Sequence, residues 1–209
     1  MPDILICVAT ALEGEGIPSR IGARSIAVVE TGVGPVNAAF ALTRALVSAR
    51  PGLVISCGIG GAYPASGLAI GDVACAESDI YGDLGAESPD GFLDMQALGF
   101  AVVAGDPPLF NRLPLDVFPL DRPVPFVTCA TCTGTDETAA QLAGRTGGAV
   151  ESMEGAAIVH VARMSGVPVA EIRGISNVVG RRDRAAWRVR EAVAAARAAV
   201  IAAIEDGRC

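Results

Sequence analysis

The sequence predicts an α/β fold, a single domain whose central mixed, twisted β-sheet is flanked by helices. Short apolar segments typical of strands alternate with segments of helical periodicity along the whole chain. Of its 209 residues, 51% are hydrophobic and only 19% are charged, which is typical of a compact globular protein. Because strands that alternate with helices form parallel or mixed sheets covered on both faces, we expect residues 1–209 to form one such domain.

The expected strands are apolar runs bounded by glycine or polar residues, at 3–10, 24–32, 53–61, 71–78, 124–131 and 167–177. Helical patterns lie at 35–49, near 136–144, from about Glu154 onward and at about 184–205. Pro35 stands early in the first turn of its helix, a favoured place for proline. The last helix carries an apolar stripe at spacings of three and four, formed by Val189, Val193, Ala196, Val200 and Ile204. Residues 79–124 are rich in proline, glycine and aspartate and predict a long excursion with little regular structure.

The charge and hydropathy pattern excludes several classes of partner. A net charge of −7 argues against an extended nucleic-acid footprint, which needs a basic face. No apolar run approaches the roughly 20 residues that span a bilayer, and residues 1–20 lack the features of a signal peptide. We therefore expect a cytoplasmic protein that binds a small molecule, with neither a nucleic-acid nor a membrane partner.

The six cysteines include one C-x-x-C motif, Cys129 to Cys132. A structural zinc site needs four ligands, and the chain offers one histidine and no second cysteine pair. A redox pair is the alternative, but such motifs usually open a helix and this one lies in a strand-like segment. We expect reduced thiols, no metal and no cofactor.

Polar groups follow the first two expected strands. Glu13 and Glu15 in "TALEGEG" come after the first strand, where ligands of α/β sheets bind, so they either activate water or are solvated loop acids. The segment "TGVGPVNAA" (31–39) resembles part of a dinucleotide fingerprint, but Asn37 replaces its third glycine. It predicts a tight strand-to-helix turn or a loop that holds a ligand at the helix N-terminus.

Two motifs lie near the carboxy terminus. "VESMEGAA" (150–157) sets Met153 and Glu154 where a strand meets a helix, so Glu154 either interacts with the helix dipole or accepts from two vicinal hydroxyls. His160 follows and is more consistent with a structural or surface position than with catalysis. "EIRGISNVVGRRDRAAW" (171–187) ends a strand on Asn177 and continues into a charged segment.

Together these motifs, with "GIGGA" and "GDV" between them, resemble the purine nucleoside phosphorylase and methylthioadenosine/S-adenosylhomocysteine nucleosidase superfamily. Within it, "GISNVVGRRDRAAW" is most similar to the futalosine hydrolases of the alternative menaquinone route. The resemblance covers nearly the whole chain. It implies a nucleoside phosphorylase-like α/β fold, cleavage of a ribosyl N-glycosidic bond and a homo-oligomeric assembly.

The resemblance also implies roles for particular residues. A glutamate after the first strand binds the attacking water: Glu15 matches best, with Glu13 as the alternative. Methionine packs on the ribose and glutamate takes its 2′ and 3′ hydroxyls, which become Met153 and Glu154. The remaining expected substrate contacts are Ile59, Gly60, Thr133, Gly134 and Thr135.

The residue at the end of the last strand departs from the adenine-specific members, which have aspartate there. The amide of Asn177 does not act as a general acid, but its two hydrogens suit N7 and O6 of hypoxanthine, both of which are acceptors. Asn177 therefore favours a 6-oxopurine, and futalosine carries hypoxanthine. Asp183 is a candidate for protonating the base, although a salt bridge with neighbouring arginines is the stronger expectation. Arg181 and Arg182 either meet the carboxylate-bearing tail of futalosine or are solvated.

Water is the expected nucleophile. Phosphorylases of this superfamily keep a G-D-P-x-R segment and a second arginine, whereas "TALEGEG" and "VISCGIGG" contain no arginine. The alternatives are an adenine-releasing nucleosidase, a 6-oxopurine nucleoside phosphorylase and, from another class, a non-catalytic nucleoside-binding protein.

Overall fold

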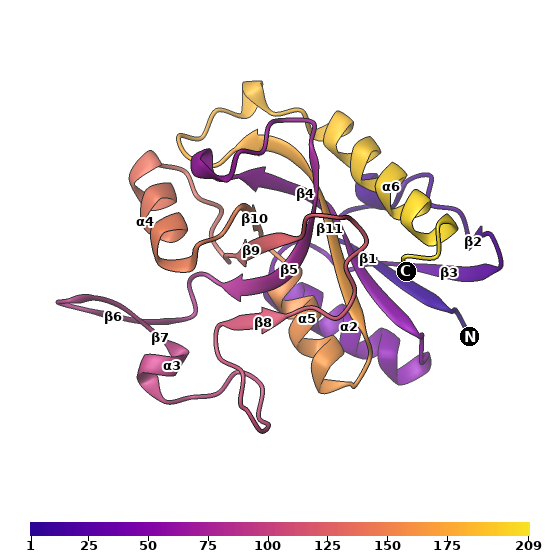
Figure 1. The fold of residues 1–209 in the computed structure, drawn as a ribbon, viewed down its shortest axis with the longest axis horizontal. Coiled ribbons are helices and arrows are strands. Elements are labelled where there is room, and N and C mark those ends of the chain that lie inside the picture. Colours follow the sequence, from indigo (N-terminus) through magenta and orange to yellow (C-terminus); the bar gives the residue numbers. More distant parts are fainter.

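The computed structural model describes all 209 residues and has the expected α/β architecture (Figure 1). The strands are β1 (Ile4–Val8), β2 (Arg20–Ile21), β3 (Arg24–Glu30), β4 (Leu53–Ala62), β5 (Val73–Tyr81), β6 (Gly85–Ser88), β7 (Gly91–Asp94), β8 (Arg112–Pro114), β9 (Val124–Thr128), β10 (Val150–Ser152) and β11 (Val169–Val178). The helices are α1 (Ala11–Gly14), α2 (Pro35–Ser48), α3 (Met95–Leu98), α4 (Asp136–Thr146), α5 (Gly155–Met164) and α6 (Val189–Glu205), with 3₁₀ turns η1 (Pro64–Ser66) and η2 (Arg184–Ala186). No helix combines the length and the hydropathy that crossing a membrane requires.

The main sheet is mixed, as predicted. Its strand order is β10-β9-β5-β11-β4-β1-β3-β2, and β8 adds to β5. β1 pairs in parallel with β3 and β4, and β11 pairs in parallel with β4, whereas β5 is antiparallel to β11. Strand β10 pairs with β9 on one side and with β4 on the other. The strands β4, β11, β5, β9 and β10 therefore close into a ring.

Helices cover both faces of this sheet (Figure 1). On one face α2 packs against α5, and their buried side chains form one core cluster with β4 and β9, which includes Leu42, Val54, Phe126 and Ile158. On the other face α6 lies over β11 and β4. The predicted stripe of α6 is buried there at Val193, Ala196, Val200 and Ile204.

The structure adds elements that the sequence pattern did not indicate. The 79–124 excursion contains the β6–β7 hairpin, α3 and β8, so it is more regular than expected. The last helix begins at Val189 and not near 184, because the Asp183 carboxylate accepts from the Ala185 N–H and caps the separate turn η2. The four-residue helix α1 falls below the length at which periodicity is detected.

A β-bulge interrupts the pairing of β11 with β4. Ile175 is in register with Gly60 and Asn177 with Gly61, so Ser176 is the extra residue. Because successive side chains of a strand alternate between faces, the extra residue places Asn177 on the face opposite Ile175. Ile175 packs into the α2–α5 core, whereas Asn177 faces a cavity.

Candidate active site

A cavity of about 450 Å³ lies at the carboxyl ends of β1, β4 and β11, where α/β sheets bind ligands. The predicted site residues that line it are Glu13, Ile59, Gly60, Thr133, Met153, Glu154 and Asn177. Those outside its lining are Glu15, Gly134, Thr135 and Asp183. The lining also includes Glu151 and Trp187, and it contains no lysine, arginine or histidine.

The Glu13 carboxylate is held by three donors at one wall of the cavity. Its Oε1 accepts from the Ile59 N–H at 3.0 Å, and its Oε2 accepts from the Thr10 N–H at 2.9 Å and the Thr10 hydroxyl at 3.0 Å. A carboxylate has about four acceptor positions, so one remains for a ligand. Glu13 is therefore well placed to hold a water molecule.

Glu15, the first expectation for this role, points elsewhere. It follows the last residue of α1, its side chain is exposed and it lines a different surface hollow. Its backbone carbonyl accepts from Arg197 of α6. The four-residue helix α1 turns Glu13 inward and Glu15 outward, which places the alternative residue, Glu13, at the cavity.

Glu154 is the N-cap residue of α5, but its carboxylate does not cap the helix. Its Oε1 accepts from the Gly34 N–H at 2.9 Å, and its Oε2 lies 3.9 Å from Arg173 Nη1. Gly34 has φ 95°, a left-handed conformation that favours glycine, so the G-x-G turn presents a backbone donor to the cavity. Burial raises the pKa of Glu154, while Arg173 and the Gly34 N–H oppose that shift.

Arg173 is a residue of this site that the sequence reasoning missed. It is 1% exposed within β11; its Nε donates to Glu171 Oε1 and its Nη2 to Ser56 Oγ, both at 2.9 Å. The available signal was an arginine inside an apolar strand, since a buried arginine needs anionic partners. A Cβ on Gly58 would lie 2.5 Å from both Arg173 Nη1 and Glu13 Oε1, so the cation lies directly behind the Glu13 carboxylate.

Two further carboxyl groups, of Asp79 and Glu171, lie behind Arg173. Asp79 and Glu171 are both fully buried, and a side chain on Gly155 would collide with both of their carboxyl groups. Burial first, and Glu171 next, raise the pKa of Asp79 well above its ordinary value. Glu171 Oε2 has no other partner, which is consistent with a proton on Asp79 shared with Glu171.

Asn177 is half-buried at the end of β11, as expected, but its amide is partly engaged. Its Oδ1 accepts from the Ser176 hydroxyl at 2.8 Å, and its Nδ2 donates to the Val178 carbonyl at 3.0 Å. One amide hydrogen is therefore free for a ligand. The expectation that both hydrogens contact a purine base does not fit this geometry.

The loop after β9 forms another wall. Thr133 donates to Glu151 through its N–H at 2.9 Å and its hydroxyl at 2.6 Å. Thr135 instead caps α4 by accepting from the Thr138 N–H, and Gly134 accepts from the Arg182 N–H. Both have structural roles in this loop.

The charged segment after Asn177 lies at one side of the cavity. The Arg182 guanidinium lies over the Trp187 ring, 5.1 Å from its centroid, and donates to Cys132 Sγ at 3.2 Å. Asp183 is exposed and makes no salt bridge, so the expected pairing with neighbouring arginines is wrong. His160 lies outside this cavity, with Nδ1 3.2 Å from the Tyr81 hydroxyl.

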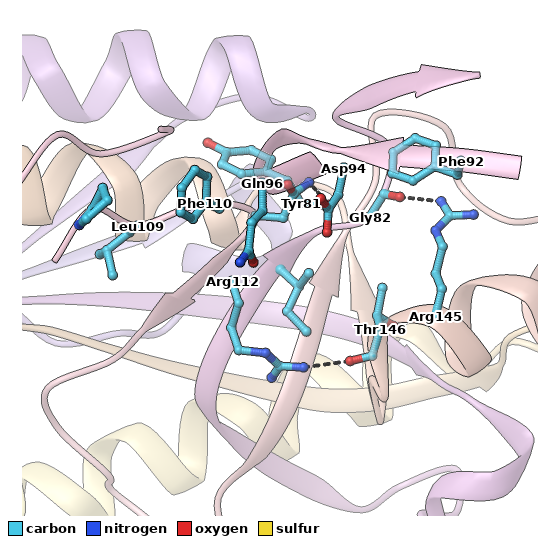
Figure 2. A pocket seen from close by; sticks show the side chains of 13 residues that line it. Tyr81, Gly82, Phe92, Asp94, Gln96, Leu109, Phe110, Arg112, Arg145 and Thr146 are labelled. Carbon is cyan, nitrogen blue, oxygen red and sulfur yellow. Dashed lines mark hydrogen bonds between the residues drawn. The ribbon is translucent and has the colours of Figure 1, made fainter. Parts of the chain in front are cut away.

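A second cavity, of about 430 Å³, lies where the 79–124 excursion meets the body of the protein (Figure 2). Arg112 donates to the Thr146 carbonyl at 2.6 Å, and Arg145 donates to the Gly82 carbonyl and lies over the Phe92 ring. These two guanidinium groups thus hold the 79–124 excursion in place. We assign the active site to the first cavity, where buried carboxylates converge.

Comparison with known proteins decides the family. A model of the Phosphorylase superfamily matches residues 7–205. Futalosine hydrolase of Streptomyces coelicolor is 44% identical over 174 residues, which cover 80% of this chain and 74% of that protein. The chain belongs to the futalosine hydrolase family. Futalosine hydrolase of Thermus thermophilus is 36% identical over 181 residues, covering 82% of this chain and 78% of that protein.

The fold agrees with this membership. The structure of futalosine hydrolase from Helicobacter pylori superposes with a TM-score of 0.80 at 15% identity, covering 97% of each chain. This chain and that structure therefore share the same fold.

Proposed function

We propose that this protein hydrolyses the N-glycosidic bond of futalosine and releases hypoxanthine and dehypoxanthine futalosine, a step of menaquinone biosynthesis. The observation that carries the proposal is a cavity lined by Glu13, Glu151 and Glu154 with no cationic side chain in its lining, in a chain of the futalosine hydrolase family. Such a lining suits a neutral ribosyl group and a water nucleophile. It would repel the phosphate dianion that a phosphorylase needs.

Glu13 orients and deprotonates the attacking water. Its three protein donors fix the carboxylate, and Arg173 lies directly behind it. Positive charge develops at the ribose in an oxocarbenium-like transition state, as in other glycoside cleavage. The carboxylates around the cavity stabilise that charge.

Glu154 accepts the 2′ and 3′ hydroxyls of the ribose while Met153 packs on its apolar face. Both residues line the cavity between β10 and α5. The Gly34 N–H and Arg173 hold the Glu154 carboxylate from behind. These contacts keep the ribose in position while the glycosidic bond breaks.

Asn177 donates its free amide hydrogen to the departing base and stabilises the charge that develops on it. Asp183 has no part in this step, because it caps η2 outside the cavity. We also propose, from the family resemblance, that the protein is a cytoplasmic homo-oligomer. The large exposed fractions of Val36, 80%, and Phe40, 64%, on α2 are consistent with an assembly, which sedimentation velocity would test.

One experiment separates the candidate functions. Futalosine, inosine and methylthioadenosine are each supplied with and without phosphate, and the released base is identified by chromatography. We expect hypoxanthine from futalosine without phosphate. Adenine release, strict phosphate dependence or binding without release would each overturn the proposal.

A further inference from the structure

The buried carboxylate of Glu151 lies in the lining of the cavity, and the mechanism above gives it no role of its own. It is 6% exposed and comes from β10, the short strand before α5. A carboxylate buried at a ligand site is costly unless donors meet it, so its partners show what it is placed to do.

Glu151 and Asn177 stand on either side of one glycine. Each is the register partner of Gly61 in β4, Glu151 across β10 and Asn177 across β11. Residues in register project to the same face of a sheet, and both side chains line the cavity. Gly61 has no side chain, and a Cβ there would lie 3.0 Å from Asn177 Nδ2. The glycine thus leaves room for Val179 Cγ2 and Asn177 Nδ2, with the Asn177 amide on one side of β4 and the Glu151 carboxylate on the other.

Three protein donors reach Glu151. Oε1 accepts from the Thr133 N–H at 2.9 Å, and Oε2 accepts from the Thr133 hydroxyl at 2.6 Å and the Tyr63 hydroxyl at 2.8 Å. Burial, and then Glu151 itself, raise the pKa of Tyr63, so the phenol keeps its proton and donates. Of about four acceptor positions on the carboxylate, one on Oε1 remains for a ligand.

We propose that Glu151 is a specificity-determining residue that accepts the N1–H of a 6-oxopurine base. Hypoxanthine carries a proton on N1, whereas adenine presents a lone pair there. With hypoxanthine, the N1–H donates to the fourth acceptor position of Glu151. With adenine, that position faces the lone pair of N1, and neither acceptor has a donor. Asn177, with one free amide hydrogen, reads the five-membered ring, and Glu151 reads the six-membered ring. The inference rests on the proposed function in that a purine nucleoside occupies the cavity.

The test compares futalosine with its 6-amino counterpart, which carries adenine, on the wild type and on Glu151→Gln. The variant keeps the size of the side chain and supplies an amide that donates to adenine N1. We expect kcat/KM for futalosine to fall about 10- to 100-fold and the preference for the 6-oxo substrate to fall at least about 10-fold. An equal loss on both substrates would show that Glu151 only supports the loop, and would overturn the proposal.

Tyr63→Phe is the matched control, since it removes one donor to Glu151 and keeps the carboxylate. We expect this variant to retain the preference for the 6-oxo substrate at whatever rate it turns over. If Tyr63→Phe lost the preference to the same extent as Glu151→Gln, the preference would depend on packing and not on the carboxylate, and the proposal would fail.

Binding of free bases tests the inference without turnover. Hypoxanthine should bind the wild type at least about 10-fold more tightly than 1-methylhypoxanthine, which lacks the N1–H, and Glu151→Gln should reduce that ratio. Equal binding of the two bases to the wild type, or an undiminished ratio in the variant, would contradict the inference. If the wild type released no base from futalosine but showed this pattern, the proposed function would fail and the inference would stand. Because the wild-type measurement needs no variant, a Glu151→Gln protein that does not fold still leaves the proposal testable.

Discussion

Glu13 and Glu15 are two residues apart, yet only Glu13 reaches the cavity. Their order of preference could not be settled from sequence, because both follow the first strand and differ only in the direction that α1 gives them. In contrast, Met153, Glu154 and Asn177 could be placed from their motifs, since each stands at the end of a long element. The partners that hold these carboxylates, such as Arg173, come from distant parts of the chain and leave little local signal.

Glu13→Gln and Glu15→Gln form a matched pair at this scale. We expect the first to lower kcat on futalosine at least about 100-fold, because an amide does not take a proton from water. The second should stay within about twofold of the wild type, since its side chain is exposed. Steady-state kinetics at saturating substrate checks both, and the reverse ranking would return the water-binding role to Glu15.

Glu154→Gln removes the charge that faces Arg173 and the ribose hydroxyls. A hydrogen bond to a charged group contributes about 1.5 to 3 kcal/mol, so we expect kcat/KM to fall about 10- to 100-fold.

The raised pKa of Glu154 also gives the wild type an acid limb above pH 4.5, where activity increases with pH as the carboxyl ionises. That limb should be absent from the pH profile of the variant. A near-normal rate would exclude the ribose role.

At the scale of the element, the central strand β4 contains three glycines near its carboxyl end, and its neighbours explain why. Side chains at Gly58, Gly60 and Gly61 would meet, respectively, the Glu13–Arg173 pair, Val150 of β10 and Asn177 of β11. The sequence pattern predicted a strand running into glycines, but not the reason for them. That reason is tertiary, because the atoms that need the space lie on other strands.

Gly58→Ala should therefore impair catalysis more than folding. Its Cβ would lie 2.5 Å from both Glu13 Oε1 and Arg173 Nη1, so one of these groups must move. We expect kcat/KM to fall at least about 10-fold, because small displacements of catalytic groups are costly. Gly52→Ala is the control, since its Cβ would be 3.5 Å from the nearest atom, the Asp3 carbonyl oxygen. Equal activity of the two variants would contradict this account of the strand.

At the scale of the whole molecule, the ring of strands encloses more negative than positive charge. Glu13, Glu154, Glu171 and Asp79 are buried around the single cation Arg173. Burial and the neighbouring Glu171 raise the pKa of Asp79 well above its ordinary value, and because unpaired buried charge is costly, this favours a proton on that carboxyl group. The mixed sheet and its two helical layers were predicted from the α/β pattern. This charge balance could not be predicted, since its members are dispersed between residues 13 and 173.

The retained proton links stability to pH. An unfolded Asp79 ionises near its ordinary pKa of 3.8, while the folded form holds its proton to higher pH. The stability contributed by this carboxyl is thus present in acid and is lost as pH rises from about 4 toward the raised pKa. Asp79→Asn mimics the protonated form. As pH rises from about 5 to 9, its unfolding midpoint should therefore fall less than the unfolding midpoint of the wild type.

The exposed Asp206 provides the control for this measurement. The unfolding midpoint of Asp206→Asn should change with pH in parallel with that of the wild type. Parallel curves for all three proteins would show that Asp79 is ionised in the folded state.

The bulge at Ser176 means that the direction of the Asn177 side chain depends on the register of β11 as well as on its residues. If the strand ran regularly at its present length, Ser176 would pair with Gly61, and Asn177 would pair with Ala62 and turn its amide toward the α2–α5 core, with no change in its identity. Loss of the bulge is therefore a second evolutionary route to a changed cavity wall in this fold. Alignments that score only substitutions at Asn177 would miss it.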